Sequence, residues 1–91
     1  MLKVGVIGAG SISLEHLCAY SKNKDCKVVA IADLNTELAK KRAEEFDIEK
    51  VYNDYMDLLN DTDIDAVSIV TPTFTHKKIV KDALLKGKDV L

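Results

Sequence analysis

The sequence contains very little cysteine. Only Cys18 and Cys26 are present among its 91 residues, and the spacing between them matches no common metal-binding or thiol redox motif. We expect both to be buried or half-buried free thiols, which stay unpaired in a reducing compartment. The sequence therefore predicts neither a disulfide framework nor a metal site.

A large excess of charge and a long hydrophobic run are also absent. The 13 basic and 15 acidic residues give a net charge of −2, so nothing suggests nucleic acid or an anionic membrane as a partner. No apolar run approaches the ~20 residues that span a bilayer. The first residues read as a strand rather than as a basic segment with a signal core. We therefore predict a cytoplasmic protein.

Short apolar runs alternate with helical patterns along the whole chain, in a composition of 47% hydrophobic and 31% charged residues. This is typical of one globular domain, expected over residues 1–91. The expected strands are residues 2–7, 27–32, 51–52, 65–70 and 90–91. The expected helices are residues 11–23, 36–46, 54–59 and 76–86. The alternation predicts an α/β fold, a Rossmann-like doubly wound parallel sheet of strand order 3-2-1-4-5, truncated after the start of strand five.

Periodicity within the helices predicts their buried faces. The first helix is expected to place on one face Leu14, Leu17, Cys18 and Ser21. The last helix is expected to turn toward the core Ile79, Val80, Ala83 and Leu84. The expected capping residues are Asn35 or Thr36 for the second helix and Thr73 or Thr75 for the last, with Gly87 as its stop.

A glycine-rich turn, Gly-Ala-Gly-Ser-Ile-Ser, follows the first apolar run at residues 8–13. Gly8 lets the chain turn sharply off the strand, and Gly10 lets a pyrophosphate approach the backbone. Free N–H groups of the following backbone, at Ser11 and Ile12, then meet the phosphates with the positive end of the helix dipole. Ser13 is a mild departure, because Gly or Ala is usual at this third position.

Asp33 ends the second apolar run, 20 residues after Ser13. A carboxylate at this place accepts hydrogen bonds from an adenosine ribose and repels a 2′-phosphate. Leu34 and Asn35 add no positive charge that would offset this repulsion. The pattern favours NAD over NADP. The alternative is that the two glycines only make a tight turn, but the strand before them and the acid after them favour dinucleotide binding.

The segment of residues 71–76 follows the fourth expected strand. In the predicted sheet, a ligand lies where strands one and four diverge at their carboxyl ends. This places the segment beside the glycine-rich turn, with Asp33 on the adenosine side. The nearby Lys77, Lys78 and Lys81 are interpreted as a solvated helix face rather than as an anion site.

Taken together, these motifs resemble the opening domain of the Gfo/Idh/MocA oxidoreductases. The turn at residues 8–13 is followed by His16, and Asp33 precedes an Ala/Glu/Lys-rich helix. Further along come Val-Tyr-Asn-Asp at residues 51–54, Thr71-Pro72 with His76, and the run from Ala83 to Leu91. The resemblance extends over essentially the whole chain.

The resemblance implies an NAD(P)-dependent enzyme that exchanges a hydride with a hydroxyl or carbonyl group of a sugar- or polyol-like substrate. It implies that Gly8, Gly10 and the backbone after them hold the pyrophosphate, and that Asp33 holds the adenosine ribose. Thr71, Pro72 and Thr73 would line the cofactor cleft, with His76 behind them. Thr73 departs from the family, which often has Asn at this place.

The family also implies elements beyond this sequence. Its members usually continue into Glu-Lys-Pro, whose lysine serves proton transfer, and into a second domain that holds most of the substrate site and mediates oligomerisation. We therefore expect no catalytic residue in residues 1–91, cofactor binding without turnover, and a homo-oligomer. We also expect exposed apolar surface around the fifth strand, with self-association of the chain.

Two other functions fit parts of the pattern. One is a stand-alone, non-catalytic module that senses or carries a nucleotide. The other is a methyltransferase, since such folds also place a glycine-rich turn and an acid around an adenosyl group. The Gly-Ala-Gly-Ser-Ile-Ser turn suits a dinucleotide better.

Overall fold

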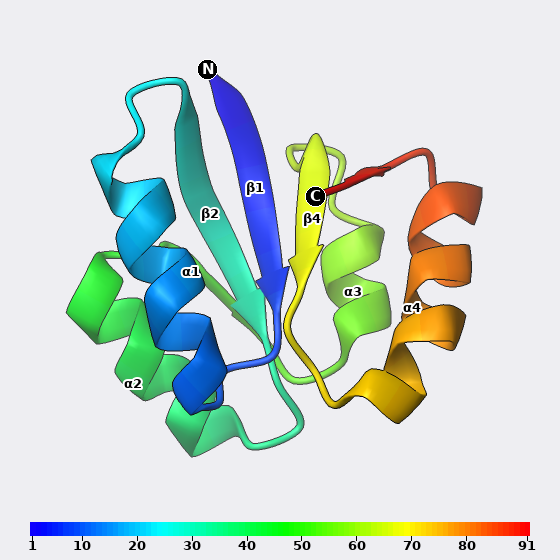
Figure 1. Cartoon of the computed structure of the whole chain (residues 1–91), viewed down its shortest axis with the longest axis horizontal. Coiled ribbons are helices and arrows are strands. Elements are labelled where there is room, and N and C mark those ends of the chain that lie inside the picture. Colours follow the sequence, from blue (N-terminus) through cyan, green and yellow to red (C-terminus); the bar gives the residue numbers. More distant parts are fainter.

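A computed structural model describes all of residues 1–91 as a five-stranded parallel sheet between two layers of helices (Figure 1). The strands are β1 (Leu2–Ile7), β2 (Cys26–Ala32), β3 (Lys50–Tyr52), β4 (Ala66–Ile69) and β5 (Asp89–Val90). The helices are α1 (Ser11–Lys22), α2 (Thr36–Phe46), α3 (Tyr55–Leu59) and α4 (Thr73–Leu85). The sheet order is β3-β2-β1-β4-β5. The predicted Rossmann-like architecture and strand order are confirmed.

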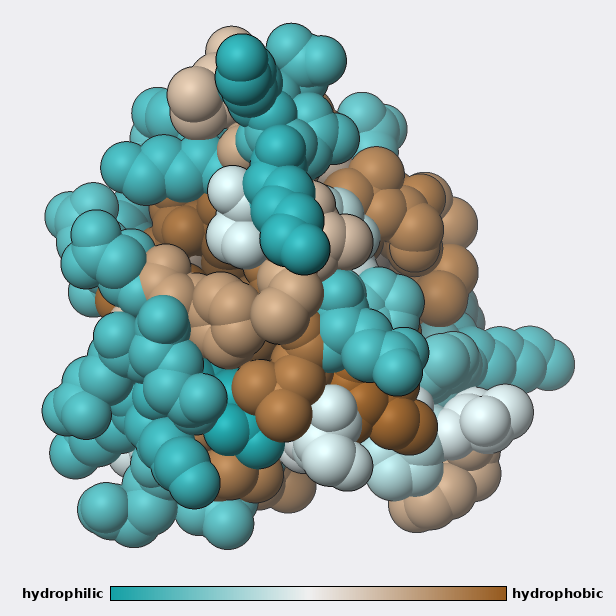
Figure 2. Space-filling model, turned by 60° about the vertical axis from the view of Figure 1, so that its left-hand side comes forward, coloured by the Kyte–Doolittle hydropathy of each residue, from teal (hydrophilic) through white to brown (hydrophobic).

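Each face of the sheet has its own hydrophobic core, because a strand buried on both sides alternates its side chains between them. On the face covered by α1 and α2, Val4 and Val6 of β1 pack with Leu17 of α1. On the face covered by α3 and α4, Leu58 of α3 packs with Ile79 of α4. Hydrophilic residues form much of the outer surface on the α1 and α2 side, with apolar side chains showing between them (Figure 2).

The residues predicted to begin helix α2 and to end helix α4 are confirmed in those roles. The side chain of Asn35 accepts a hydrogen bond from the N–H of Leu38 at 3.2 Å, which caps the helix. Gly87, with φ of +76°, likewise ends α4 as predicted.

Helix α4 begins at Thr73, three residues before the predicted start at residue 76. Pro72 stands directly before the first turn, where its missing N–H costs nothing. The hydroxyl of Thr75 donates to the carbonyl of Pro72 at 2.7 Å from inside the first turn, and no side chain caps the helix, so the predicted capping by Thr73 or Thr75 is wrong.

Three predicted core positions are wrong. Cys18 and Ser21 are exposed, because the buried residues of α1 are Ser13 and Leu17. Leu84 is 60% exposed, because α4 buries Ile79 and Ala83, and the next residue along a helix is turned by about 100°.

A polar cluster holds the turn between α3 and β4, at the end of the sheet away from the glycine-rich turn. The Asp61 carboxylate accepts hydrogen bonds from Lys50 Nζ at 2.9 Å and from the Tyr52 hydroxyl at 2.7 Å. The buried Lys88 donates from Nζ to the carbonyls of Asp61 and Ile64. The hydrogen bonds to the Asp61 carboxylate from Lys50, from the backbone N–H of Asp63 and from Tyr52 hold its pKa at about 2, below its usual 3.8, with the Lys50 bond as the largest cause.

Candidate cofactor-binding site

Three loops meet at the carboxyl ends of the central strands. β1 pairs with both β2 and β4, and Ile7 lies level with Ala32 on one side and with Ile69 on the other. The loops that follow these strands therefore lie side by side. They form a cavity of about 230 Å³ whose lining includes Gly8, Asp33 and Thr71.

Gly8 is the residue that turns the chain away from β1. Its φ is +111°, and a Cβ at this position would lie 3.0 Å from the carbonyl carbon and oxygen of Val70. Its N–H donates to the carbonyl of Ala32 at 2.8 Å, which joins the turn to the end of β2. Glycine is thus required here both by its backbone conformation and by the close approach of Val70, the residue directly after β4.

Gly10 has the opposite environment. Its φ of −67° suits any residue, and a Cβ would meet nothing within 4 Å, so the space in front of it is open. Helix α1 starts at Ser11 without a capping side chain or an acidic residue in its first turn. The N–H groups of Gly10, Ser11 and Ile12 donate to no backbone carbonyl. Three free donors at a helix N-terminus suit an anion such as a pyrophosphate.

Ser13 fits the third motif position, despite being neither Gly nor Ala. Its side chain is fully buried. Its hydroxyl donates to the carbonyl of Gly10 at 2.6 Å, so no polar atom is left without a partner. A small residue that satisfies its own hydroxyl locally still allows α1 to pack closely on the sheet.

Asp33 lies at the same end of the sheet as the two glycines, where the strands have their carboxyl ends, and contacts the turn directly. Its Oδ2 accepts a hydrogen bond from the N–H of Ala9 at 2.7 Å, and its Oδ1 accepts one from the N–H of Asn35 at 2.8 Å. Each carboxylate oxygen keeps a further lone pair, so the group can still accept ribose hydroxyls. The acid at the end of β2 is thus fixed beside the turn.

The segment after β4 forms the opposite wall. The structure brings Thr71 into the cavity with Gly8 and Asp33, and Thr71 and Pro72 also line an adjoining apolar hollow of about 510 Å³. His76 lies behind this loop, where its Nε2–H donates to the carbonyl of Thr71 at 2.6 Å. Thr73, in contrast, is exposed at the first position of α4 and lines neither hollow.

Several lining residues were not predicted from the sequence. Leu34 and Phe74 flank the apolar hollow and are 83% and 86% exposed. Asn53 ties the loop after β2 in place, because its Nδ2 donates to the carbonyl of Leu34 and to the hydroxyl of Thr36. Tyr55 borders both hollows. A large apolar residue directly after Asp33 was the one signal in the sequence, since a turn there would usually be polar.

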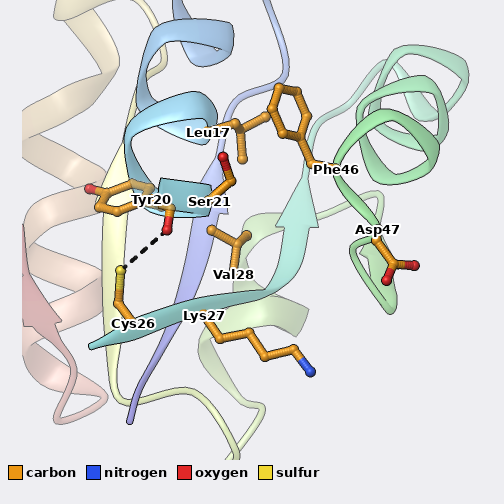
Figure 3. Close-up of a pocket in the computed structure, with 8 residues that line it drawn as sticks. All are labelled: Leu17, Tyr20, Ser21, Cys26, Lys27, Val28, Phe46 and Asp47. Carbon is orange, nitrogen blue, oxygen red and sulfur yellow. Dashed lines mark hydrogen bonds between the residues drawn. The ribbon is translucent and has the colours of Figure 1, made fainter. Parts of the chain in front are cut away.

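A separate cavity of about 220 Å³ lies between α1 and the start of β2 (Figure 3). Leu17 and Phe46 line it, and Cys26 contacts the carbonyl of Tyr20 with its Sγ at 3.8 Å. It lies at the amino end of β2, at the other end of the strand from Asp33. Along the whole chain no three His, Cys, Asp or Glu side chains are grouped to hold a metal ion. None of the four helices has the length and apolarity to cross a membrane.

This arrangement is matched by a known family. Residues 2–91 match GFO_IDH_MocA, described as an oxidoreductase family with an NAD-binding Rossmann fold. The chain belongs to this family. The resemblance to Gfo/Idh/MocA oxidoreductases noted in the sequence is confirmed, and a nicotinamide cofactor is the ligand class of the family.

Relatives within the Gfo/Idh/MocA family differ in cofactor. The oxidoreductase YrbE of Bacillus subtilis is 40% identical over 86 residues, covering 94% of this chain and 25% of YrbE. The Lactobacillus casei myo-inositol dehydrogenase, solved with NAD(H) and myo-inositol, has a TM-score of 0.93 and 35% identity, over 99% of this chain and 27% of that one. A variant of the Actinomadura kijaniata 3-ketoreductase KijD10 was solved with TDP-benzene and NADP. It has a TM-score of 0.93 and 36% identity, and the match covers 99% of this chain and 28% of that one. This chain thus spans about a quarter of the length of these relatives.

Proposed function

We propose that residues 1–91 form the cofactor-binding domain of an oxidoreductase and hold NAD in preference to NADP. The proposal rests on one combined observation: three free N–H groups at the start of α1 lie next to a carboxylate that is hydrogen-bonded to the same turn. Gly10, Ser11 and Ile12 would bind the pyrophosphate, and Gly8 would give the turn its shape. Asp33 would accept the adenosine ribose hydroxyls.

The wall after β4 would complete this site. Thr71 and Pro72 would border the bound dinucleotide, and His76 would keep the loop in place through its bond to the Thr71 carbonyl. Thr73 would contribute its backbone position at the start of α4 rather than its side chain. The bound nicotinamide would accept or donate a hydride; the residues named here bind and orient it.

We further propose that the whole protein acts on a hydroxyl or carbonyl group of a sugar- or polyol-like substrate. The myo-inositol bound by the Lactobacillus casei relative supports this substrate class. Proton transfer would use groups outside residues 1–91, so this chain alone would bind cofactor without turnover.

The cofactor preference rests on charge at the end of β2. Asp33 is followed by Leu34 and Asn35, and neither carries a positive charge that would form an ion pair with a 2′-phosphate. In the test, calorimetry measures the dissociation constants of NADH and NADPH for the wild type, Asp33→Asn and Asp33→Ala. We expect NADH to bind the wild type more tightly than NADPH. Asp33→Asn keeps an acceptor but removes the charge. It should therefore lower the ratio of the NADPH dissociation constant to the NADH dissociation constant by about tenfold or more.

Asp33→Ala removes both the charge and the acceptor, so it should also weaken NADH binding. A folded wild-type chain that binds neither nucleotide would refute the proposed function. An unchanged NADH-to-NADPH ratio in Asp33→Asn would refute the role of Asp33 as the discriminating charge.

A further inference from the structure

Arg42 is a buried cation that reaches the glycine-rich turn from a different element. It lies on α2, with a side chain only 9% exposed. Its Nε donates to the carbonyl of Ala9 at 3.0 Å, and its Nη1 donates to Glu45 at 2.7 Å. Arginine is seldom buried unless its donors are paired. Here one of those donors reaches 33 residues back to the turn.

Ala9, between the two glycines, is therefore held on both sides. Its N–H donates to Asp33 Oδ2 at 2.7 Å, and its carbonyl accepts from Arg42. The residue is fully buried, so neither backbone group has water as an alternative partner.

The Arg42 contact also fixes the direction of a neighbouring donor. The peptide bond between Ala9 and Gly10 is planar, and the chain contains no cis peptide bond. In a trans peptide the C=O and the following N–H point in opposite directions. A carbonyl held toward Arg42 therefore turns the N–H of Gly10 the other way, toward the open side of the turn. Glycine at position 10 would otherwise leave this peptide free to rotate.

We propose that Arg42 is a positioning residue for the cofactor's pyrophosphate, acting through the Ala9–Gly10 peptide. It contacts no phosphate itself. Its hydrogen bond presents the Gly10 N–H to the phosphate oxygens before the ligand binds. This inference rests on the proposed dinucleotide site, and it assigns to α2 a part in phosphate binding that the glycine-rich turn alone does not explain.

The test separates the donor from the charge. Arg42→Gln places an amide nitrogen at the position of Arg Nε along the side chain, so it keeps the donor and loses the charge. Arg42→Met has a similar length and no donor. Lys41→Met, at the exposed neighbouring position on α2, is the matched control for loss of a positive charge from this helix.

Dissociation constants of NADH and ADP-ribose are measured on the full chain, at a temperature where circular dichroism shows every variant folded. We expect Arg42→Met to bind both ligands about tenfold more weakly than the wild type, in line with the loss of one charged hydrogen bond. Arg42→Gln should recover most of the affinity, and Lys41→Met should match the wild type. A purely structural role would lower the melting temperature but leave the affinity of the folded chain unchanged.

The outcomes separate the two proposals. If the wild type binds neither ligand, the proposed function fails and this inference falls with it. If the wild type binds and Arg42→Met binds equally well, only the inference is overturned. If Arg42→Gln is as weak as Arg42→Met, the charge rather than the donor acts, and the positioning mechanism is overturned.

A measurement on the wild type covers the case in which Arg42→Met does not fold. In NMR spectra of the ligand-free chain, the Arg42 Nε proton should exchange slowly with solvent, because it is buried and bonded to Ala9. The Gly10 amide signal should then shift on addition of NADH. A rapidly exchanging Nε proton, or a Gly10 amide that does not respond to NADH, would contradict the proposal.

Discussion

At the two glycines of the turn, an added methyl group would meet different surroundings. Gly8→Ala puts a Cβ 3.0 Å from the backbone of Val70 at a φ of +111°, so we expect it to lower the free energy of unfolding by about 2 kcal/mol or more. Gly10→Ala meets no atom and has an ordinary φ, so its stability should change by less than about 1 kcal/mol. Its methyl group would instead occupy the open space where the proposed site would hold the pyrophosphate, and NADH affinity should fall. Urea unfolding and NADH titration of both variants check this; equal destabilisation by the two would contradict it.

The carboxyl group of Asp61 should make stability depend on pH. Its pKa is about 2 in the folded chain against 3.8 for the free group, because Lys50, the Asp63 N–H and Tyr52 bond to its charged form. A lowered pKa gives stability that is present above about pH 4 and is lost as the pH falls toward 2. The contribution is up to about 2 kcal/mol. Unfolding of the wild type and Asp61→Asn should differ most near neutral pH and converge near pH 2. A constant difference across this range would contradict the assignment.

At the scale of whole elements, the periodicity of apolar residues and the residues that end helices predicted the fold well. Buried parallel strands read as continuous apolar runs, and Gly87 marked a helix end by its residue type and its place after the last apolar pair. Contacts between elements distant in the sequence could not be read this way. Arg42 looked like one more cation on a charged helix, because only the folded chain brings α2 next to Ala9. The prediction that Leu84 is buried was wrong for a related reason, since packing between elements decides which side of α4 faces the sheet, and that side carries Ile79 and Ala83.

Helix α2 provides a test of a single element, because its N-terminus depends on one side chain. Asn35 Oδ1 accepts from the Leu38 N–H, while the backbone N–H of Asn35 separately donates to Asp33. Asn35→Ala removes the first bond and keeps the second. We expect a loss of about 1 kcal/mol in the free energy of unfolding. Measured NADH affinity should stay close to that of the wild type; a large loss of affinity without loss of stability would contradict a capping role.

For the molecule as a whole, apolar surface collects near the sheet edge formed by β5. Leu84 and Leu85 at the end of α4 are 60% and 75% exposed, and Leu91 is exposed beside β5. β5 pairs only with β4, so its other edge is open. We expect this chain to self-associate at high concentration, with a rising average mass in light scattering. Replacing Leu84 and Leu85 by Lys should reduce the association, whereas Phe74→Lys at the far end of α4 should not. A wild type that stays monomeric at every concentration would contradict the prediction.

The bonds from Gly8 to Ala32 and from Ala9 to Asp33 and Arg42 have one more consequence for the molecule. They form during folding, so the conformational entropy of the turn is already lost in the ligand-free state. A nucleotide bound at the proposed site would meet donors already in their final orientation, and its affinity would not be reduced by the cost of ordering a loop. Recognition at this turn would therefore be closer to a rigid template than to an induced fit.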